Sequence, residues 1–124
     1  MRTLLLLMLV GATGSSALSA QEITGAITGV VTDQSGAVVP GATVTVRNVA
    51  TNIETAMVTD GSGVYLASNL PVGPYEVKAE LAGFRTYIRS DLEVHVADRL
   101  RVNPVLQTGA VSETVIVAGA SPVV

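Results

Sequence analysis

Two short stretches of the sequence carry an aspartate and a serine at the same spacing on a glycine-bearing segment. They are residues 32–36, with the sequence TDQSG, and residues 59–63, with the sequence TDGSG. Oxygen ligands of this kind can bind calcium, and a serine can act as a nucleophile. The same residues can also form a hydrogen-bonded turn, so their surroundings must decide between three kinds of chemistry.

The surroundings of both stretches favour a turn. Calcium takes about six to eight oxygen ligands, several of them carboxylates, and each stretch supplies one carboxylate. A serine nucleophile needs a base, and the single histidine, His95, falls on the polar side of an alternating segment. An aspartate at the start of a turn accepts a backbone hydrogen bond, and a glycine supplies a positive φ. We therefore predict no catalytic, metal-binding or cofactor-binding residues, and structural turns at Asp33, Gly36, Asp60, Gly63 and Gly73.

The segments around these turns alternate between apolar and polar residues with a period of two. Short runs of this kind cover residues 27–32, 42–47, 75–80, 92–97 and 99–102, and Gly, Pro, Asn or Asp residues bound them. This pattern is typical of strands with one buried face. About seven such strands can bury their apolar faces only by pairing into two packed sheets. We therefore predict an all-β fold, an antiparallel β-sandwich of about seven strands.

Two further features follow from this pattern. Pro104 lacks a backbone donor, so the run around it is expected at a sheet edge or a bulge. The aromatic residues Tyr65, Tyr75 and Phe84 fall at core positions, which leaves mainly Tyr87 as a candidate for an exposed aromatic surface.

The first twenty residues have the layout of a secretory signal peptide. A positive Met1-Arg2 start precedes the apolar run LLLLMLV and a small, polar stretch that ends in SALSA. The run is much shorter than the roughly 20 residues that a spanning helix needs. Cleavage after Ala17 or after Ala20 satisfies the pattern, and we favour Ala20. Residues 1–20 are therefore predicted to direct export, with no membrane span in this chain.

The composition narrows the possible partners of the exported part. Without Arg2 the chain carries six basic and ten acidic residues, with no basic cluster, which argues against nucleic acid and anionic lipid as partners. The sequence contains no cysteine, so disulfides cannot stabilise the domain outside the cell.

Several linked motifs resemble the carboxypeptidase regulatory-like domain family. They are ITGVVTDQSG followed by VPGATV, TDGSGVY, NLPVGPYEV and AGF, in this order from about Gly25 to Leu106. The resemblance implies a transthyretin-like (prealbumin-like) sandwich of the carbohydrate-binding-like group over residues 21–107. It does not imply peptidase activity, because a zinc carboxypeptidase needs His and Glu ligands that one histidine cannot supply. We therefore expect no enzyme activity.

The C-terminal segment, residues 108–124, carries a second resemblance. Its GAVSETVIVA sequence is similar to the segment that joins this domain to the plug of Oar-like TonB-dependent outer-membrane receptors. Within it, six residues resemble a TonB box, an extended peptide that adds a strand to a partner sheet; they are Glu113, Thr114, Val115, Ile116, Val117 and Ala118. The same alternation fits a terminal strand of the sandwich or an ordered linker, so both interpretations stay open.

Together these features predict a non-enzymatic, exported interaction module of a TonB-dependent receptor. Its expected location is the periplasm or the periplasmic side of the outer membrane, where it would serve transport and engage TonB or another envelope protein. Because the chain stops at Val124, before any plug, it is expected to be a receptor fragment or a stand-alone exported sandwich. The alternative is a secreted carbohydrate- or surface-binding module, which would need exposed aromatic side chains such as Tyr87.

Overall fold

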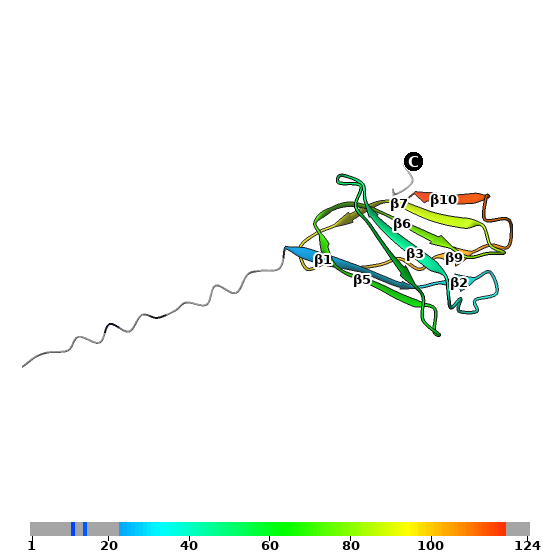
Figure 1. The fold of residues 1–124 in the computed structure, drawn as a ribbon, viewed down its shortest axis with the longest axis horizontal. Helices are drawn as coiled ribbons and strands as arrows, with labels where there is room; N and C mark the ends of the chain where they lie inside the picture. The colour runs from blue at the N-terminus through cyan, green and yellow to red at the C-terminus, as the bar shows by residue number, and fades with distance from the viewer. Residues whose placement is uncertain (1–10, 12–13, 15–22, 119–124) are drawn as a thin grey trace, which may run out of the picture.

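The computed structural model describes residues 11, 14 and 23–118, so the predicted signal peptide lies almost entirely outside the described residues. The described part is built from strands, without a helix (Figure 1). No helix that is long and apolar enough to span a membrane occurs within it. The ten strands are β1 Thr24–Val30, β2 Thr32–Asp33, β3 Thr43–Asn48, β4 Glu54–Val58, β5 Val64–Pro71, β6 Gly73–Glu80, β7 Thr86–Val94, β8 Arg99–Arg101, β9 Val105–Leu106 and β10 Thr114–Ala118.

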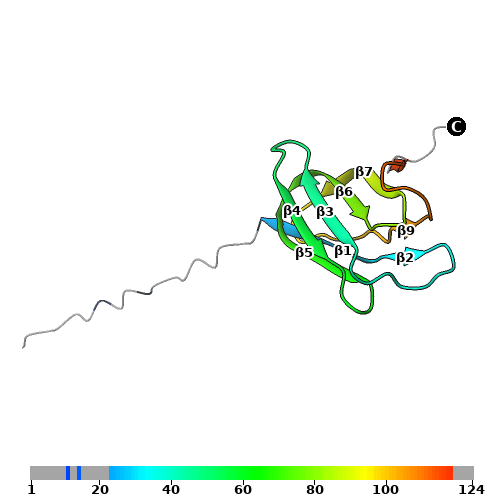
Figure 2. The same cartoon turned by 45° about the vertical axis from the view of Figure 1, so that its right-hand side comes forward.

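The strands form two packed sheets and a short third one. The larger sheet has the order β10-β7-β6-β3-β4, and the smaller one has the order β5-β1-β8. Strands β2 and β9 pair with each other at one end of the sandwich (Figure 2). The predicted all-β, transthyretin-like sandwich is therefore confirmed.

The core lies between the inner faces of the two main sheets. Alternate residues of β1, β3 and β6 are buried, as the period of two predicts. Ile27 comes from the smaller sheet, and Val44 and Val77 come from the larger one; all three are fully buried. Because each strand buries one face only, neither sheet is expected to be stable without the other.

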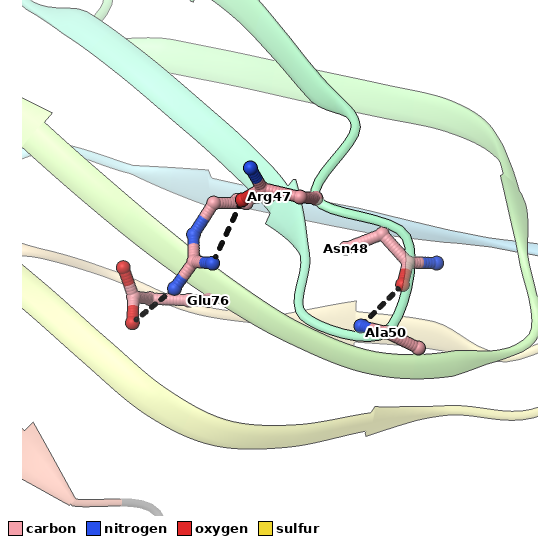
Figure 3. A network of polar contacts seen from close by, with 5 residues as sticks. Arg47, Asn48, Ala50 and Glu76 are labelled. Carbon is pink, nitrogen blue, oxygen red and sulfur yellow. Dashed lines mark hydrogen bonds and ion pairs between the residues drawn. The ribbon is translucent and has the colours of Figure 1, made fainter.

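The polar face of the larger sheet carries paired charges. Arg47 on β3 and Glu76 on β6 project toward one another, with 3.2 Å between Nη2 and Oε2 (Figure 3). Lys78 and Glu80 form a second pair with 2.9 Å between Nζ and Oε1, and this pair raises the pKa of Lys78. At the end of β3 the Asn48 Oδ1 accepts a hydrogen bond from Ala50 N (Figure 3).

The sheets also contain parallel pairings, which the expected antiparallel sandwich lacks. Consecutive strands such as β3 and β4 pair antiparallel, because a tight turn reverses the chain. Strands β8, β9 and β10 instead pair parallel with β1, β2 and β7. Their connections cross the sandwich or run around its end, so the chain returns in the same direction as the strand it joins.

The end of β7 and the position of Pro104 refine the strand prediction. The alternating run over residues 92–97 was expected to be a strand, but β7 ends at Val94 and Val96 is exposed in the following turn. Asp98 accounts for this end, since its side chain accepts a hydrogen bond from the His95 N–H. Pro104 lies between β8 and β9, is fully buried, and accepts a hydrogen bond from Thr32 N through its carbonyl.

Candidate strand-addition site

The two aspartate stretches lie at turns and use their polar atoms internally. Asp33 Oδ1 accepts hydrogen bonds from Ser35 N at 2.8 Å and Ala37 N at 3.1 Å, and from the Ser35 hydroxyl. Asp60 Oδ1 accepts hydrogen bonds at 2.9 and 3.0 Å from the N–H groups of residues 62 and 64. Within the described residues, no cluster of three or more His, Cys, Asp or Glu side chains could hold a metal ion.

The glycines of these stretches have the positive φ that such turns require. Gly36 has a φ of 87° and Gly63 a φ of 74°. Gly73, at the tight connection between β5 and β6, has a φ of 144°. All three positions favour glycine for conformational reasons, so no ligand is needed to account for them.

The single histidine does not join the serines of the turns. His95 is exposed in the turn after β7, where its backbone N–H donates to Asp98 Oδ2 at 2.9 Å. The Ser35 hydroxyl donates to Asp33 instead. Within the part of the chain that the structure describes, no hydrogen bond links His95 to Ser35 or Ser62, so no serine–histidine pair is formed.

The expected exposure of Tyr87 is wrong. Its side chain faces the core and is 9% exposed, because Tyr87 lies opposite the buried Ala79 on the inner face of the larger sheet. Tyr65 and Tyr75 are also buried, and Phe84 packs against the core. Every aromatic side chain of the sequence is therefore at least partly covered, and none offers an open platform for stacking on a sugar.

The TonB-box-like residues form β10 at one edge of the larger sheet. Strand β10 pairs parallel with β7, from Thr114 opposite Thr86 to Ala118 opposite Ser90. Figure 1 shows β10 in red along the outer edge of the sheet. Among the described strands none pairs with the other side of β10, so this edge is open. The segment is therefore a terminal strand of the sandwich. The addition of a partner's strand to it is a proposal.

The register defines which main-chain groups of β10 stay available. Thr86 N donates to the Glu113 carbonyl at 2.8 Å. In a parallel ladder successive residues turn their N–H and C=O groups to opposite sides of the strand. Residues 113, 115 and 117 therefore face β7, and residues 114, 116 and 118 present their N–H and C=O groups at the open edge. This row of groups can pair with an added strand.

The side chains of β10 divide in the same way between the two faces of the sheet. Val115 and Val117 are half-buried, and Val117 packs against the core. Ile116 points to the other face and is 69% exposed. The strand carries no charged residue, so desolvating its edge against a partner would cost little.

Contacts with the start of β7 hold the connection before β10. Arg85 N donates to Gln107 O at 2.7 Å, and the Thr86 hydroxyl donates to Val111 O at 2.8 Å. Arg85 Nε also lies 2.8 Å from Glu113 Oε2, although the geometry is an ion pair rather than a hydrogen bond. These contacts fix the direction in which β10 enters the sheet.

Sequence reasoning missed the part of β7 that receives β10. The residues from Thr86 to Ser90 do not alternate in polarity, because Arg89 stands at an inward-facing position. A sheet edge that binds a strand through main-chain groups has little side-chain signature, so the pattern of apolar residues could not reveal it.

Comparison with known proteins defines the class to which this sandwich belongs. Residues 26–107 match the family described as carboxypeptidase regulatory-like domain. The chain therefore belongs to this family, as the motifs predicted. The matched residues begin within β1, continue through β9 and end before β10.

The particular relatives agree with this assignment. The chain is 34% identical over 87 residues to the TonB-dependent transporter Oar of Myxococcus xanthus. The aligned region covers 68% of this chain and 8% of the transporter. The chain thus spans less than a tenth of the length of that relative.

Among solved structures, the Bacillus anthracis TIE protein aligns with a TM-score of 0.57 and 22% identity over 69% of this chain and 17% of its own. A putative carbohydrate binding protein from Bacteroides uniformis aligns with a TM-score of 0.54 and 20% identity over 66% of this chain and 40% of its own. At these identities the two structures establish the fold alone.

Proposed function

We propose that this chain is an exported, non-enzymatic interaction module of a TonB-dependent transporter, and that residues 113–118 are its partner-binding strand. The likeness to Oar supports the transporter context, and family membership supports a regulatory-like rather than a catalytic role. The observation that carries the binding role is the open, uncharged edge of β10 with its exposed Ile116.

The proposed partner is TonB, which would add a strand to this segment. Main-chain hydrogen bonds would supply the affinity, and alternate side chains would supply the choice of partner. The module would act in the periplasm or on the periplasmic side of the outer membrane, as export by the predicted signal peptide requires. The intact mass of the exported protein would distinguish cleavage after Ala20 from cleavage after Ala17.

The carbohydrate-binding alternative gains no support from the site. It required an exposed aromatic side chain, and Tyr87 is buried. The similarity to a putative carbohydrate binding protein is one of fold.

Binding of the full chain to the purified periplasmic C-terminal domain of the host's TonB tests the proposal. Two proline variants remove one main-chain donor each, Val115→Pro on the side facing β7 and Ile116→Pro on the open side. We expect at least one of them to weaken binding by about tenfold or more, because an added strand must pair with one of the two sides.

Two control variants complete this experiment. Ile116→Ala keeps the N–H group and is expected to weaken binding less than Ile116→Pro does. Ser112→Ala, before the segment, should leave the affinity unchanged. Absence of binding by the wild-type chain, or equal affinity of both proline variants and the wild type, would overturn the proposal.

A further inference from the structure

A groove opens between the start of β4 and the end of β5, which are edge strands of the two main sheets. It has a volume of about 290 Å³. Val46, Leu70 and Tyr75 form its apolar floor, and all three side chains are almost fully buried. None of the described residues that line the groove is charged. The groove therefore has room for one aromatic side chain and no charged group to hold an ion.

Asn48 contributes a polar group to this groove. Its side chain lines the groove and is 6% exposed. The Oδ1 atom accepts hydrogen bonds from Ala50 N at 2.9 Å and Thr51 N at 3.1 Å, which fixes the orientation of the amide. The Nδ2 atom therefore points away from Ala50 (Figure 3), and a Cβ on Gly73 would lie 3.8 Å from it. Nδ2 donates no hydrogen bond within the described part of the chain, so a bound oxygen atom would satisfy it.

Strand β4 borders the groove and is an open edge of the larger sheet. Just beyond its last paired residue, Thr59 N donates to Ala42 O at 2.9 Å. In an antiparallel ladder the hydrogen-bonded positions alternate, so residues 55 and 57 also face β3. Residues 54, 56 and 58 then present their N–H and C=O groups outward, and none of the described strands pairs with them.

The edge of β4 lacks the features by which edge strands avoid pairing. It contains no proline, its register with β3 is continuous, and its one charged residue, Glu54, is exposed opposite Arg47 on the outer face. Strand β5 differs, since it ends in Pro71 and bulges at Ser68 and Asn69, where Asn69 has a φ of 56°. An added strand can therefore join the groove on the β4 side.

The inner face of such an added strand would lie over the groove. Ile53, whose carbonyl accepts a hydrogen bond from Asn48 N at 2.9 Å, lines the groove and is 67% exposed. A residue added beside Ile53 would share this face. Its backbone would lie two strand spacings, about 10 Å, from that of Asn48, so only a long side chain reaches Nδ2. Tyrosine has this length, an apolar ring for the floor and an oxygen at its end.

Glu54 gives the added strand a second requirement. Its carboxylate takes part in no ion pair among residues 23–118. Arg47, which stands opposite it on β3, contacts Glu76 and Asn52 instead. A lysine or arginine of the added strand beside Glu54 would therefore complement this charge.

We propose that the β4 edge and the adjoining groove bind an extended segment of a partner protein, in which a tyrosine fills the groove beside Ile53 and the neighbouring basic residue pairs with Glu54. Main-chain groups of Glu54, Ala56 and Val58 hold the segment, and Asn48 Nδ2 donates to the tyrosine hydroxyl. The site lies at the opposite edge of the larger sheet from β10. It is therefore separate from the proposed TonB site and does not depend on the proposed function.

The probe is a synthetic heptapeptide, TVTVKYT, with acetylated and amidated ends. Paired antiparallel with its tyrosine beside Ile53, it places its lysine beside Glu54 and both valines on the inner face. In an NMR titration of the full chain we expect shift changes at residues 53–58 and at the Asn48 side-chain amide. The peptide TVTVKFT lacks the hydroxyl and should bind about fivefold more weakly. Absence of TVTVKYT binding, or equal affinity for the two peptides, would overturn the proposal.

Two sets of variants test the edge. Ala56→Pro removes an outward N–H group and should weaken binding about tenfold or more, whereas Ala56→Val keeps this group and should bind as the wild type does. The wild type should prefer TVTVKYT to TVTVEYT by about threefold, and Glu54→Lys on the exposed face should reverse this preference. Equal affinity of the two Ala56 variants, or an unchanged preference in Glu54→Lys, would contradict strand addition at this edge.

The donor and the other possible occupant have their own measurements. Asn48→Ala should bring the ratio of the affinities for TVTVKYT and TVTVKFT close to one, and a general loss of stability would not change this ratio. An unchanged ratio would contradict the role of Nδ2. Gel filtration of the wild type and Ala56→Pro should show two monomers. A wild-type dimer that Ala56→Pro converts to a monomer would assign the edge to a second copy of the chain and overturn the proposal.

Discussion

The two TD-x-SG turns have nearly the same sequence and the same backbone hydrogen bonds, but different surroundings. In each, the aspartate N–H donates to the carbonyl four residues on, at 2.9 Å for Asp33 and 3.1 Å for Asp60. In each, the glycine N–H donates back to the aspartate carbonyl, at 3.0 Å for Gly36 and 2.9 Å for Gly63. The local residues therefore specify the shape of the turn in both places.

The packing of the two turns differs. Gly63 is buried against the segment after β1, where its carbonyl accepts a hydrogen bond from Val31 N at 2.8 Å. Gly36 is exposed, and a Cβ at this position would meet no other atom within 4 Å. The threonine before each aspartate differs too, since Thr59 is buried and Thr32 is half-buried. The same local sequence therefore forms the same turn in both places, but only the turn at residues 59–63 is packed into the interior.

The largest expected effect is that of an alanine at Gly63. The new Cβ would lie 2.7 Å from the Val31 carbonyl oxygen, and the residue would keep a φ of 74°. We expect Gly63→Ala to lower the free energy of unfolding by about 2–5 kcal/mol, from left-handed strain together with the close backbone contact. Urea denaturation of the purified chain measures this.

Two other glycines provide the controls for this experiment. Gly36→Ala has the strain without the contact, so a loss of about 1 kcal/mol is expected. Gly61→Ala has neither a positive φ nor an atom within 4 Å and should be neutral or slightly stabilising. Equal losses at Gly63 and Gly36 would show that the surroundings of the turns do not matter.

The second prediction concerns the threonine that precedes each aspartate. Thr59 Oγ1 accepts a hydrogen bond from Ala42 N at 2.9 Å and donates to Val39 O at 2.8 Å. Thr59→Val leaves both backbone groups buried without partners, so we expect a loss of about 1–3 kcal/mol.

The matched variant is Thr32→Val. Its side chain has no hydrogen bond within the described part of the chain, so the free energy of unfolding should change by less than about 0.5 kcal/mol. Thermal unfolding of the two variants in parallel gives the comparison. A smaller loss for Thr59→Val than for Thr32→Val would contradict the packing difference.

The two turns also show what the sequence can and cannot predict. The spacing of Asp33, Gly36, Asp60 and Gly63 was sufficient to expect turns, because their shape depends on hydrogen bonds within five residues. Gly63 and Thr59 are buried against the segment from Val31 to Ala42, which lies well before them in the sequence. A local pattern contains no information about such a contact.

The same limit applies to the candidate site. Alternation of Val115 and Val117 indicated a strand, but neither its parallel pairing with β7 nor its exposed edge could be read from it. Arg89 breaks the polarity pattern of β7 and therefore hid the first half of that strand. Residues that serve an edge depart from the pattern of a buried strand, since they must discourage pairing as well as support it.

The smallest expected effect is the pH dependence that distinguishes Asp33. The Ser35 hydroxyl donates to Asp33 Oδ1 and lowers the pKa of this carboxyl below its ordinary value. Desolvation raises this pKa, whereas the N–H groups of the turn lower it further. Since the pKa is depressed in the folded state, the contribution of Asp33 to stability is present above the ordinary pKa and is lost as the pH falls through the folded value. The stability difference between the wild type and Asp33→Asn, measured by urea unfolding from about pH 6 to about pH 2, should therefore shrink below about pH 4. In a Ser35→Ala background the hydroxyl is absent, so the pKa of the folded state is less depressed, and the decline should be smaller and should end at a higher pH. A difference that grows as the pH falls would contradict this assignment of the carboxylate to the turn.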